Sequence, residues 1–364
     1  MKREFKRREF LKAAGIGIAG SAVAAPAIAQ SAPELKWRLT ASWPKSLDTL
    51  YGGCEYFSKR VAEMTDNKFQ IQVFAAGEIV PGLQVLDAVQ SGNVEMGNTA
   101  LYYYWGKDPA FTYGTALPFG LNARQINSWY RFGGGHELMT ELLASYNCYG
   151  VIAANTGAQM GGWFRKEIKG LADIKGLKFR IGGFGGKIIE RIGGVPQNIP
   201  GGEIYQALEK GTIDAAEWVG PYDDLKLGFN KIAQNYYYPG WWEGGPQLDF
   251  FINTKAWDAL SAEYKAMVEA AASHAHVDML AKYDWRNPVA LKTLVGSGTK
   301  LFRFPKDMMD SSFKAANEVY AELNSSNADW KKIYADFSAW RRDANLWFRF
   351  TEAGFDDFMQ AQRL

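Results

Sequence analysis

The sequence contains few of the residues that hold soft metals and redox cofactors. Its 364 residues include only 2 cysteines and 3 histidines. Neither a cysteine set for an iron–sulfur cluster nor a C-x-x-C-H haem attachment pattern is present. His274 and His276 lie two positions apart in a stretch with helical character, so their side chains face different sides and make a poor metal pair. These shortages argue against a haem, iron–sulfur or zinc-dependent protein.

A nucleotide-binding fingerprint is also missing. The run from Gly182 to Gly186 is rich in glycine, but the phosphate-binding loop pattern needs Gly at position 181 and Ser or Thr at position 188. This chain has Ile181 and Ile188 there. No G-x-G-x-x-G pattern fits either, which argues against a dinucleotide-dependent dehydrogenase.

The two cysteines leave two interpretations open. In an oxidising compartment, Cys54 and Cys148 can form a disulfide, which would contribute about 4–5 kcal/mol in the entropic model. Alternatively, they are two small buried residues with free thiols. The sequence does not decide between these interpretations.

No apolar run reaches membrane-spanning length. Residues 13–29 form a short run that is rich in Ala and Gly and contains Pro26, so a membrane anchor is disfavoured. The paired arginines Arg7 and Arg8 precede Phe-Leu and this run, which ends in Ala-Ile-Ala. The pattern resembles a twin-arginine export signal with a small-residue cleavage site. We interpret residues 1–29 as a signal peptide and expect a periplasmic protein.

The signal segment also explains the positive charge of the chain. It holds six of the 41 Lys and Arg residues and two of the 39 Asp and Glu residues, so the rest carries 35 basic and 37 acidic residues, a net charge of −2. The net charge of +2 for the whole chain therefore gives no indication of nucleic-acid binding. We expect no nucleic-acid partner.

The pattern after the signal indicates two α/β domains. The remaining 335 residues suggest two domains at roughly 100–200 residues each. Residues 37–41 and 69–74 read as strands on either side of a helical stretch at 47–64, which is a βαβ unit. Residues 88–95 and 207–214 share Ala, an aliphatic residue, Gln or Glu, Gly, a β-branched aliphatic residue and an acid in step. Two similar α/β halves explain this repeat.

Arg180 is the first candidate ligand-binding residue. It lies in the apolar run 177–181, which predicts a buried strand, and the glycine run and a helix from Lys187 follow. A guanidinium beside a helix N-terminus favours an anion, because the fork matches a carboxylate and the helix adds positive potential. The alternative is an arginine paired with a local Asp or Glu.

Other polar residues fall at the predicted ends of strands. Asn155 ends one predicted strand, Gln159 lies in the loop after it, and Glu217 and Trp218 lie at the end of another strand. Ligands of open α/β sheets bind beyond the carboxyl ends of strands, so these residues are candidates for the same site. Glu243 lies between two tryptophans and a glycine pair, either placed for function or as an exposed loop carboxylate.

From Trp37 to its C-terminus the chain resembles the solute-binding subunits of tripartite ATP-independent periplasmic (TRAP) transporters. The resemblance rests on Phe179-Arg180 and on the blocks YQALEKGTIDAAE at residues 205–217 and GNVEMG at 92–97. Three further motifs resemble the branch that binds 2-oxo or 2-hydroxy monocarboxylates together with a cation: NTGAQ at 155–159, EW at 217–218 and WE at 242–243.

This resemblance implies an α/β two-domain periplasmic binding protein with hinge-crossing strands, a long helix that spans both domains, and C-terminal helices. Residues 261–285, helical in period and rich in Ala, are the candidate for the long helix. We expect hinge closure on the ligand, because Arg180 and residues 102–105 belong to opposite domains. The expected parts are the signal at 1–29, domain I at 34–153 plus 245–285, domain II at 154–244 plus 286–327, and a C-terminal helical segment at 328–364.

The resemblance also implies roles for the candidate residues. Arg180 clamps the ligand carboxylate, and Asn155 adds an amide donor. The cation ligands are the side chains of Gln159, Glu217 and Glu243 and the main-chain carbonyl of Trp218. All-oxygen coordination suits sodium or calcium. The aromatic residues that close over a small apolar tail are Tyr102, Tyr103, Trp218 and Trp242, although for each of them taken alone core packing is the better explanation in a chain with 13 Trp, 18 Tyr and 22 Phe.

The function implied is capture of a small 2-oxo monocarboxylate such as pyruvate, with a bound cation, for delivery to TRAP membrane subunits. The chain is then not an enzyme. The alternatives are a binding protein for a 2-hydroxy acid such as lactate with calcium, an exported redox enzyme acting on oxo acids, and a ligand-sensing partner of a receptor.

The C-terminal region carries a helical stripe of large aromatic residues. Its members recur at spacings of three, four and seven: Trp330, Tyr334, Phe337, Trp340 and Trp347. The stripe predicts a homodimer through the C-terminal helices. Docking on the body of the same chain is the alternative.

Overall fold

The structure, a computed structural model, describes residues 34–362. The signal peptide predicted at residues 1–29 lies outside this range. No helix among the described residues is long and apolar enough to cross a membrane.

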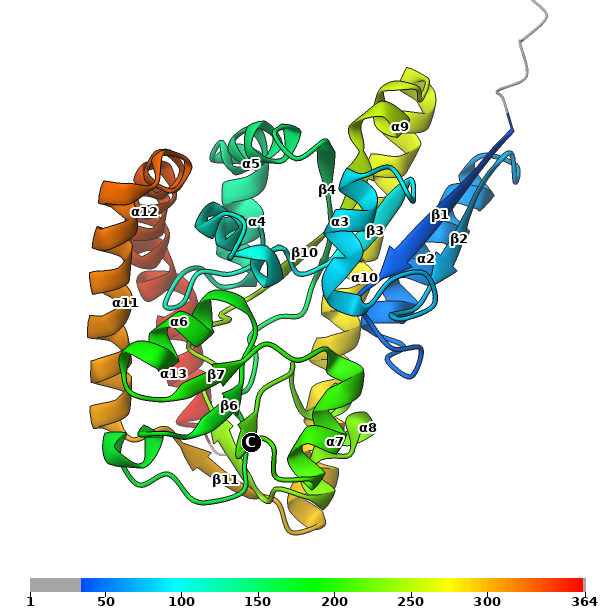
Figure 1. The fold of residues 1–364 in the computed structure, drawn as a ribbon. Coiled ribbons are helices and arrows are strands. Elements are labelled where there is room, and N and C mark those ends of the chain that lie inside the picture. Colours follow the sequence, from blue (N-terminus) through cyan, green and yellow to red (C-terminus); the bar gives the residue numbers. More distant parts are fainter. Residues whose placement is uncertain (1–33, 363–364) are drawn as a thin grey trace, which may run out of the picture. The chain divides into compact units, whose positions relative to one another are not determined.

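A five-stranded mixed sheet forms the first layer (Figure 1). Strand β1 pairs in parallel with β2 and β3, whereas β10 is antiparallel to both β3 and β4. In spatial order the strands are β2 (Phe69–Phe74), β1 (Leu35–Ala41), β3 (Met96–Thr99), β10 (Gln247–Asn253) and β4 (Cys148–Asn155).

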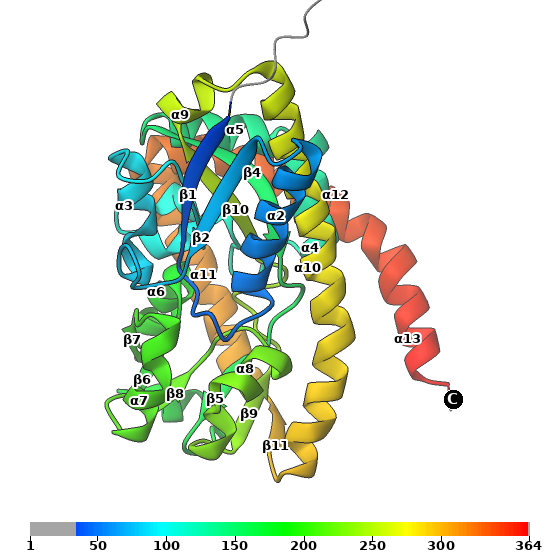
Figure 2. The ribbon, with the colours of Figure 1, turned by 90° about the vertical axis from the view of Figure 1, so that its right-hand side faces the viewer.

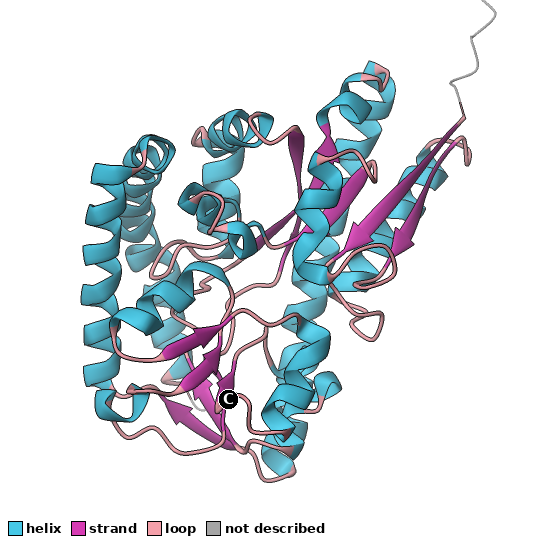
Figure 3. Cartoon of the chain, in the orientation of Figure 1, coloured by secondary structure: helices cyan, strands magenta, loops and turns pink. Residues whose placement is uncertain are grey.

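A six-stranded mixed sheet forms the second layer, as Figure 3 shows in magenta. Strand β6 is parallel to β7 and β8, β9 is parallel to β11, and β5 is antiparallel to β8 and β9. In spatial order the strands are β11 (Lys300–Arg303), β9 (Asn235–Tyr238), β5 (Gly162–Phe164), β8 (Ala215–Ala216), β6 (Lys178–Arg180) and β7 (Val195–Gln197).

Helices occupy most of the connections. The α-helices are α2 (Leu50–Met64), α3 (Val85–Gln90), α4 (Ala123–Phe132), α5 (Gly135–Ala144), α6 (Gly183–Arg191), α7 (Ile204–Glu209), α8 (Pro221–Leu227), α9 (Thr254–Asp258), α10 (Ala262–Gly296), α11 (Lys306–Ser326), α12 (Ala328–Phe348) and α13 (Gly354–Gln360). Shorter helical turns are Gly82–Gln84, Leu101–Tyr104, Pro109–Gly114, Leu171–Ile174, Gly201–Glu203, Phe229–Lys231 and the π-helical Arg349–Ala353.

The chain passes between the two sheets more than once. It leaves the first sheet after β4, returns from β9 to β10, and reaches β11 of the second sheet through α10. Helix α10 contacts α2 and β4 of the first layer and α8 of the second, and Figure 2 shows it running along both. The two-domain α/β fold with a spanning helix, expected from the sequence, is therefore confirmed. The domain boundaries remain a prediction.

The long helix is longer than its sequence signal suggested. It begins after Ser261, whose side chain accepts from the main-chain nitrogen of Tyr264 at 3.2 Å, and it continues through Pro288 to Gly296. A proline inside a helix costs one main-chain hydrogen bond and crowds the preceding turn. Pro288 is exposed, so its ring does not disturb the packed face of the helix.

The repeated segments at 88–95 and 207–214 form the same local structure. In each, a short helix, α3 or α7, leads into a glycine with positive φ, which is +76° at Gly92 and +70° at Gly211. A strand follows, and β3 and β8 each pair in parallel with a neighbour. Glycine is favoured at both positions because side chains disfavour this left-handed conformation.

The cysteines and the C-terminal stripe can now be placed. Cys54 and Cys148 are free and buried, so no disulfide joins them. Trp330 and Phe337 are buried against Tyr113, at ring distances of 4.8 and 5.3 Å, so this part of the stripe docks on its own chain. Trp347 remains 62% exposed near the end of α12. Figure 2 shows α13 extending beyond the end of α12.

Candidate ligand and cation site

A small cavity lies where strands of both sheets end. Its volume is about 20 Å³, above the roughly 10–15 Å³ that a cavity needs in order to hold one water molecule. Its walls come from the segments that follow β1, β3, β4 and β8, and from the start of β10. The lining residues are Trp43, Leu50, Ala100, Tyr102, Tyr103, Thr156, Gln159, Trp218, Val219, Pro246 and Leu248.

Arg180 and Glu217 form a buried ion pair beside this cavity. Arg180 ends β6 and Glu217 directly follows β8, and these strands are parallel neighbours, so both side chains leave the sheet at the same edge. The Nη1 group of Arg180 donates to Oε1 of Glu217, and to its main-chain oxygen at 2.8 Å. Each side chain is 1% exposed. The arginine therefore has a local acidic partner, the alternative considered from the sequence.

The Nη2 group of Arg180 makes weaker hydrogen bonds than the rest of the guanidinium. Its Nε donates to the main-chain oxygen of Ile199 at 3.0 Å, whereas Nη2 has only a long contact of 3.4 Å with the hydroxyl of Tyr103. The Cζ atom of the Arg180 guanidinium lies 5.1 Å from the ring centre of Trp218, at cation–π distance. Nη2 is thus the edge of Arg180 that can serve a ligand carboxylate.

Four buried side-chain oxygen atoms at this site have no hydrogen-bond partner. They are Oε2 of Glu217, both carboxylate oxygens of Glu243, and Oε1 of Gln159. The Gln159 amide donates from Nε2 to Thr156 Oγ1 at 3.1 Å, so its oxygen is the end left over. Buried polar atoms normally have a hydrogen-bond partner, so these four atoms are free to bind something else, and carboxylate and amide oxygens are the ligands that hard cations take. The residues present therefore fit sodium or calcium.

The two carboxylates have different electrostatic surroundings. Burial raises the pKa of Glu217, but Arg180 and the main-chain N–H of Gly182, which donates to Oε1 at 2.7 Å, oppose the rise. Burial raises the pKa of Glu243 well above its usual value, and the charge of Glu217 raises it further. The nearby hydroxyl of Tyr102, which does not reach the geometry of an ordinary hydrogen bond to Glu243, and the charge of Arg180 lower it only in part. Glu243 is thus the acid that most needs a positive neighbour.

Asn155 holds the loop that carries Gln159. Its Nδ2 donates to the main-chain oxygen of Gly245 at 3.0 Å, and its Oδ1 accepts from the nitrogen of Gly157 at 2.8 Å. Both ends of the amide therefore bind main chain. In this structure Asn155 joins the segment before Gln159 to the segment after Glu243.

The predicted aromatic residues separate into two groups. Tyr102, Tyr103 and Trp218 line the cavity. Trp242 is not among the lining residues, and its ring centre lies 5.7 Å from that of Phe179 and 5.9 Å from that of Phe304 in the core. These contacts favour core packing for Trp242, and its contact with a ligand stays a prediction.

Several lining residues were missed from the sequence. Trp43 follows β1 and its Nε1 donates to Oδ1 of Asn98 at 2.6 Å, so the rule about strand ends would have found it. Leu50 begins α2, and Leu248 lies inside β10. Both are apolar residues in a regular helix or strand, like the residues of the core, so the sequence offered no reason to assign either of them to a ligand site. Among residues 34–362 no group of three or more His, Cys, Asp and Glu could hold a metal, so any cation here needs amide or main-chain oxygens as well.

The chain matches a family model over most of its length. Residues 40–327 match the bacterial extracellular solute-binding protein, family 7. The chain is 48% identical to a monocarboxylate 2-oxoacid-binding periplasmic protein of Nostoc sp., over 98% of this chain and 100% of that protein.

Solved structures of TRAP transporter solute-binding proteins are similar to it as well. One from Bordetella bronchiseptica, a dimer with calcium and picolinate in one site, is 50% identical with a TM-score of 0.89, and the match covers 90% of this chain and 98% of that one. One from Pseudoalteromonas atlantica, with sodium and pyruvate, is 36% identical with a TM-score of 0.87, and the match covers 91% and 100%.

These proteins are receptors for solutes, so the expectation that the chain is not an enzyme is confirmed, and the redox-enzyme alternative is not supported. The chain belongs to the family 7 bacterial extracellular solute-binding proteins and is a periplasmic solute-binding protein of the TRAP type.

Proposed function

We propose that this protein captures pyruvate or a closely similar 2-oxo monocarboxylate together with sodium or calcium, and delivers it to the membrane subunits of a TRAP transporter. The observation that carries the proposal is the set of four unpartnered, buried oxygen atoms on Gln159, Glu217 and Glu243. The relatives that bind 2-oxo acids, one of them with sodium and pyruvate, favour an oxo acid over a hydroxy acid.

Charge balance supports joint binding of an anion and a cation. Arg180 and Glu217 offset each other, which leaves Glu243 and the ligand carboxylate as two negative charges in a buried site. Such a surplus is unfavourable in a low-dielectric interior. Sodium reduces it by one charge and calcium removes it.

In this proposal, different residues bind the cation, bind the ligand carboxylate and position the loops. The carboxylate oxygens of Glu217 and Glu243, Oε1 of Gln159 and the main-chain carbonyl of Trp218 hold the cation, which supplies positive charge for the ligand oxygens. Arg180 receives the ligand carboxylate through Nη2. The walls formed by Tyr102, Tyr103 and Trp218 exclude water, and the two sheets close on the ligand. Asn155 positions the loop with Gln159.

Calorimetry tests the proposal. Pyruvate is titrated into protein stripped of metal by a chelator, in buffer free of sodium, and again with sodium or calcium restored. We expect measurable affinity only with a restored ion. Equal affinity in both conditions would exclude the cation, and no heat in any condition would exclude pyruvate.

We further propose that two copies associate through the C-terminal helices. The apolar side chains beyond residue 345 that are at least 60% exposed are Leu346, Trp347, Phe350, Phe355 and Phe358. Such a patch usually marks an interface. Sedimentation equilibrium at micromolar concentration should show a dimer for the full chain and a monomer after Trp347→Glu. A monomeric full chain would contradict the proposal.

A further inference from the structure

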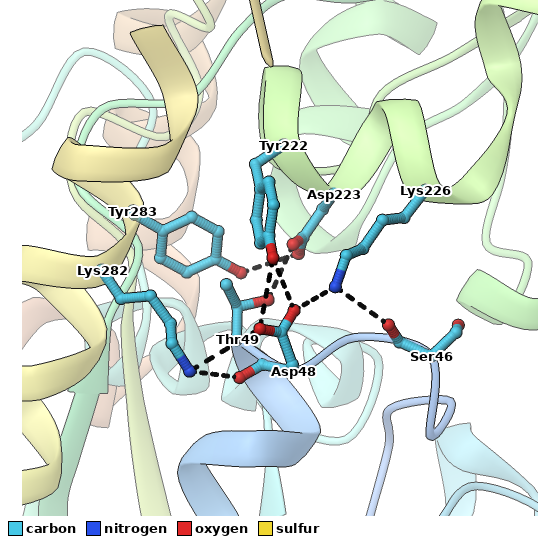
Figure 4. Close-up of polar contacts among 8 residues, drawn as sticks. All are labelled: Ser46, Asp48, Thr49, Tyr222, Asp223, Lys226, Lys282 and Tyr283. Carbon is cyan, nitrogen blue, oxygen red and sulfur yellow. Dashed lines mark hydrogen bonds and ion pairs between the residues drawn. The ribbon is translucent and has the colours of Figure 1, made fainter. Parts of the chain in front are cut away.

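A cluster of polar side chains joins Ser46–Thr49 to helices α8 and α10 (Figure 4). The Ser46–Thr49 segment lies between β1 of the first sheet and α2, whereas α8 follows β8 of the second sheet. The cluster therefore bridges the two layers. None of the side chains in Figure 4 lines the cavity, so they belong to no ligand contact described above.

The buried half of the cluster centres on Asp223. Thr49 Oγ1 donates to its Oδ1 at 2.7 Å, across 174 positions of sequence. The hydroxyl of Tyr283, on α10, donates to Oδ2 at 2.7 Å. Asp223 is fully buried, so these two donors replace the water that its carboxylate has lost.

The other half centres on Asp48 and is partly exposed. Its carboxylate forms an ion pair with Lys226 of α8 and accepts from the hydroxyl of Tyr222 at 3.1 Å. Lys282 of α10 donates to the main-chain oxygen of Asp48 at 2.8 Å. Side chains from two helices thus hold the same short segment.

The Thr49 hydroxyl does not cap the helix that follows it. A capping threonine has an extended backbone and accepts a hydrogen bond from a main-chain N–H of the first helical turn, whereas Thr49 has αR angles (φ −85°, ψ −76°) and no capping bond. Its hydroxyl donates to Asp223. The described hydrogen bond of this side chain is therefore the one that bridges the layers.

The bridge also lies next to two walls of the cavity. Thr49 immediately precedes Leu50, and Asp223 immediately precedes Asp224, whose Oδ1 accepts from the main-chain nitrogen of Val219 at 3.3 Å. Leu50 and Val219 both line the cavity. Holding Thr49 against Asp223 therefore holds these two walls together.

We infer that the contact between Ser46–Thr49 and α8 is a latch that keeps the cleft closed around the ligand and sets how long the ligand stays bound. The inference rests on the proposed function, because it takes the space between the sheets as the ligand site. Apparent affinity falls in proportion to the population of the binding-competent form. Loosening the latch therefore weakens binding without removing any contact to the ligand.

The variant Thr49→Val tests the latch, because it removes the hydroxyl and keeps the branched shape of the side chain. Stopped-flow tryptophan fluorescence follows pyruvate in the presence of calcium. We expect the dissociation rate to rise about tenfold, the factor of one hydrogen bond to a charged group, while the association rate changes less than about twofold. An unchanged dissociation rate would overturn the inference.

Tyr236→Phe is the matched control. The hydroxyl of Tyr236 donates to Oδ2 of Asp224 at 2.6 Å, so this variant also removes one hydroxyl from a buried aspartate of α8, but entirely within the second layer. We expect its rates to stay within about twofold of the unsubstituted protein. Equal acceleration in both variants would show a general effect of disturbing α8 and would overturn the latch.

Failure of the proposed function would look different. If the unsubstituted protein takes up no pyruvate with any ion, the ligand assignment fails, and small-angle scattering of the ligand-free proteins then decides about the latch. We expect a larger radius of gyration for Thr49→Val than for both the unsubstituted protein and Tyr236→Phe. Identical radii in all three would overturn it.

Discussion

The main-chain nitrogen of Gln159 donates a hydrogen bond to the main-chain oxygen of Glu243 at 3.2 Å. Gln159 lies between β4 and β5, and Glu243 lies between β9 and β10, so this bond joins two of the connections by which the chain passes between its sheets. Both residues also carry buried side-chain oxygens without partners. The hydrogen bond therefore holds two candidate cation ligands side by side at the place where the chain crosses between the sheets.

Replacing Glu243 should weaken the cation and the ligand together. Glu243→Gln keeps the shape of the side chain but removes the negative charge that this buried carboxyl, whose pKa is raised, would carry once a cation displaces its proton. We expect affinity for calcium measured with pyruvate present, and affinity for pyruvate measured with calcium present, to fall at least tenfold, as for a charged hydrogen bond. The effect of each on the binding of the other is reciprocal, so the coupling must be lost equally in both titrations.

Glu203→Gln is the control for this experiment, because Glu203 is an exposed glutamate in the second layer. It should leave both affinities unchanged. A Glu243→Gln protein that binds pyruvate normally with calcium would remove this carboxylate from the site.

Arg180→Met should reduce both binding and stability. It removes the Nη2 group proposed for the ligand, and it also leaves Glu217 buried without its charged partner. Breaking a buried ion pair from one side typically costs about 3–5 kcal/mol. Urea unfolding should show this loss, and calorimetry should show no measurable affinity for pyruvate.

The double variant Arg180→Met with Glu217→Gln separates the two effects. It removes both charges, so we expect most of the lost stability to return while binding stays absent. Restored binding in the double variant would mean that Arg180 acts only as the partner of Glu217.

The sequence predicted the parts of the site that lie at strand ends. Arg180, Glu217 and Gln159 follow short apolar runs, and the rule for open α/β sheets brings such ends together. It could not show that Arg180 and Glu217 face each other, because that depends on β6 and β8 being neighbours in the second sheet. Pairing order between strands far apart in sequence leaves no local pattern.

The exact start of a helix and the side of a loop on which an aromatic ring packs were harder to predict than the presence of the helix or the loop. Helix α6 begins at Gly183, ahead of the predicted start at Lys187, because the glycine run enters the helix. Trp242 and Tyr102 were both predicted to contact the ligand because each is a large aromatic residue near the other candidate residues. Of the two, Tyr102 lines the cavity and Trp242 does not. Which side of a loop an aromatic ring occupies is decided by tertiary contacts, and Phe179 and Phe304 form the core that takes Trp242.

A methyl group at Gly183 should hold the cleft open. Gly183 has a φ of +54°, and a Cβ there would lie 2.5 Å from Cδ2 of Tyr102, across the space between the layers. Gly183→Ala is therefore strained in its own backbone and pushes against Tyr102. We expect affinity for pyruvate to fall by about 5- to 150-fold, from a cost of about 1–3 kcal/mol.

Gly202→Ala supplies the comparison, because a Cβ at Gly202 meets no atom within 4 Å. It should bind pyruvate as the unsubstituted protein does. Normal affinity in Gly183→Ala would show that Tyr102 does not approach the glycine run in the bound state.

Stability should fall as pH rises from 4 to 8, with Asp249 as one cause. Asp249 is buried in β10, and burial raises its pKa from 3.8 to about 8 even though Tyr130 and Gln247 donate to it at 3.2 and 3.1 Å. Between these values the folded protein keeps a proton that the unfolded chain has lost, so the free energy of unfolding decreases by up to about 1.4 kcal/mol per pH unit.

Asp249→Asn removes this proton linkage, because the amide is neutral at every pH in the range. Urea unfolding at pH 5 and pH 8 should therefore show a smaller loss of stability in the variant than in the unsubstituted protein. Some slope remains, since burial also raises the pKa of Asp224 to about 7. Asp258→Asn, at an exposed position, controls for the change in net charge and should keep the full slope. Equal slopes in Asp249→Asn and the unsubstituted protein would mean that Asp249 is already ionised at pH 5, with Tyr130 and Gln247 stabilising its charge.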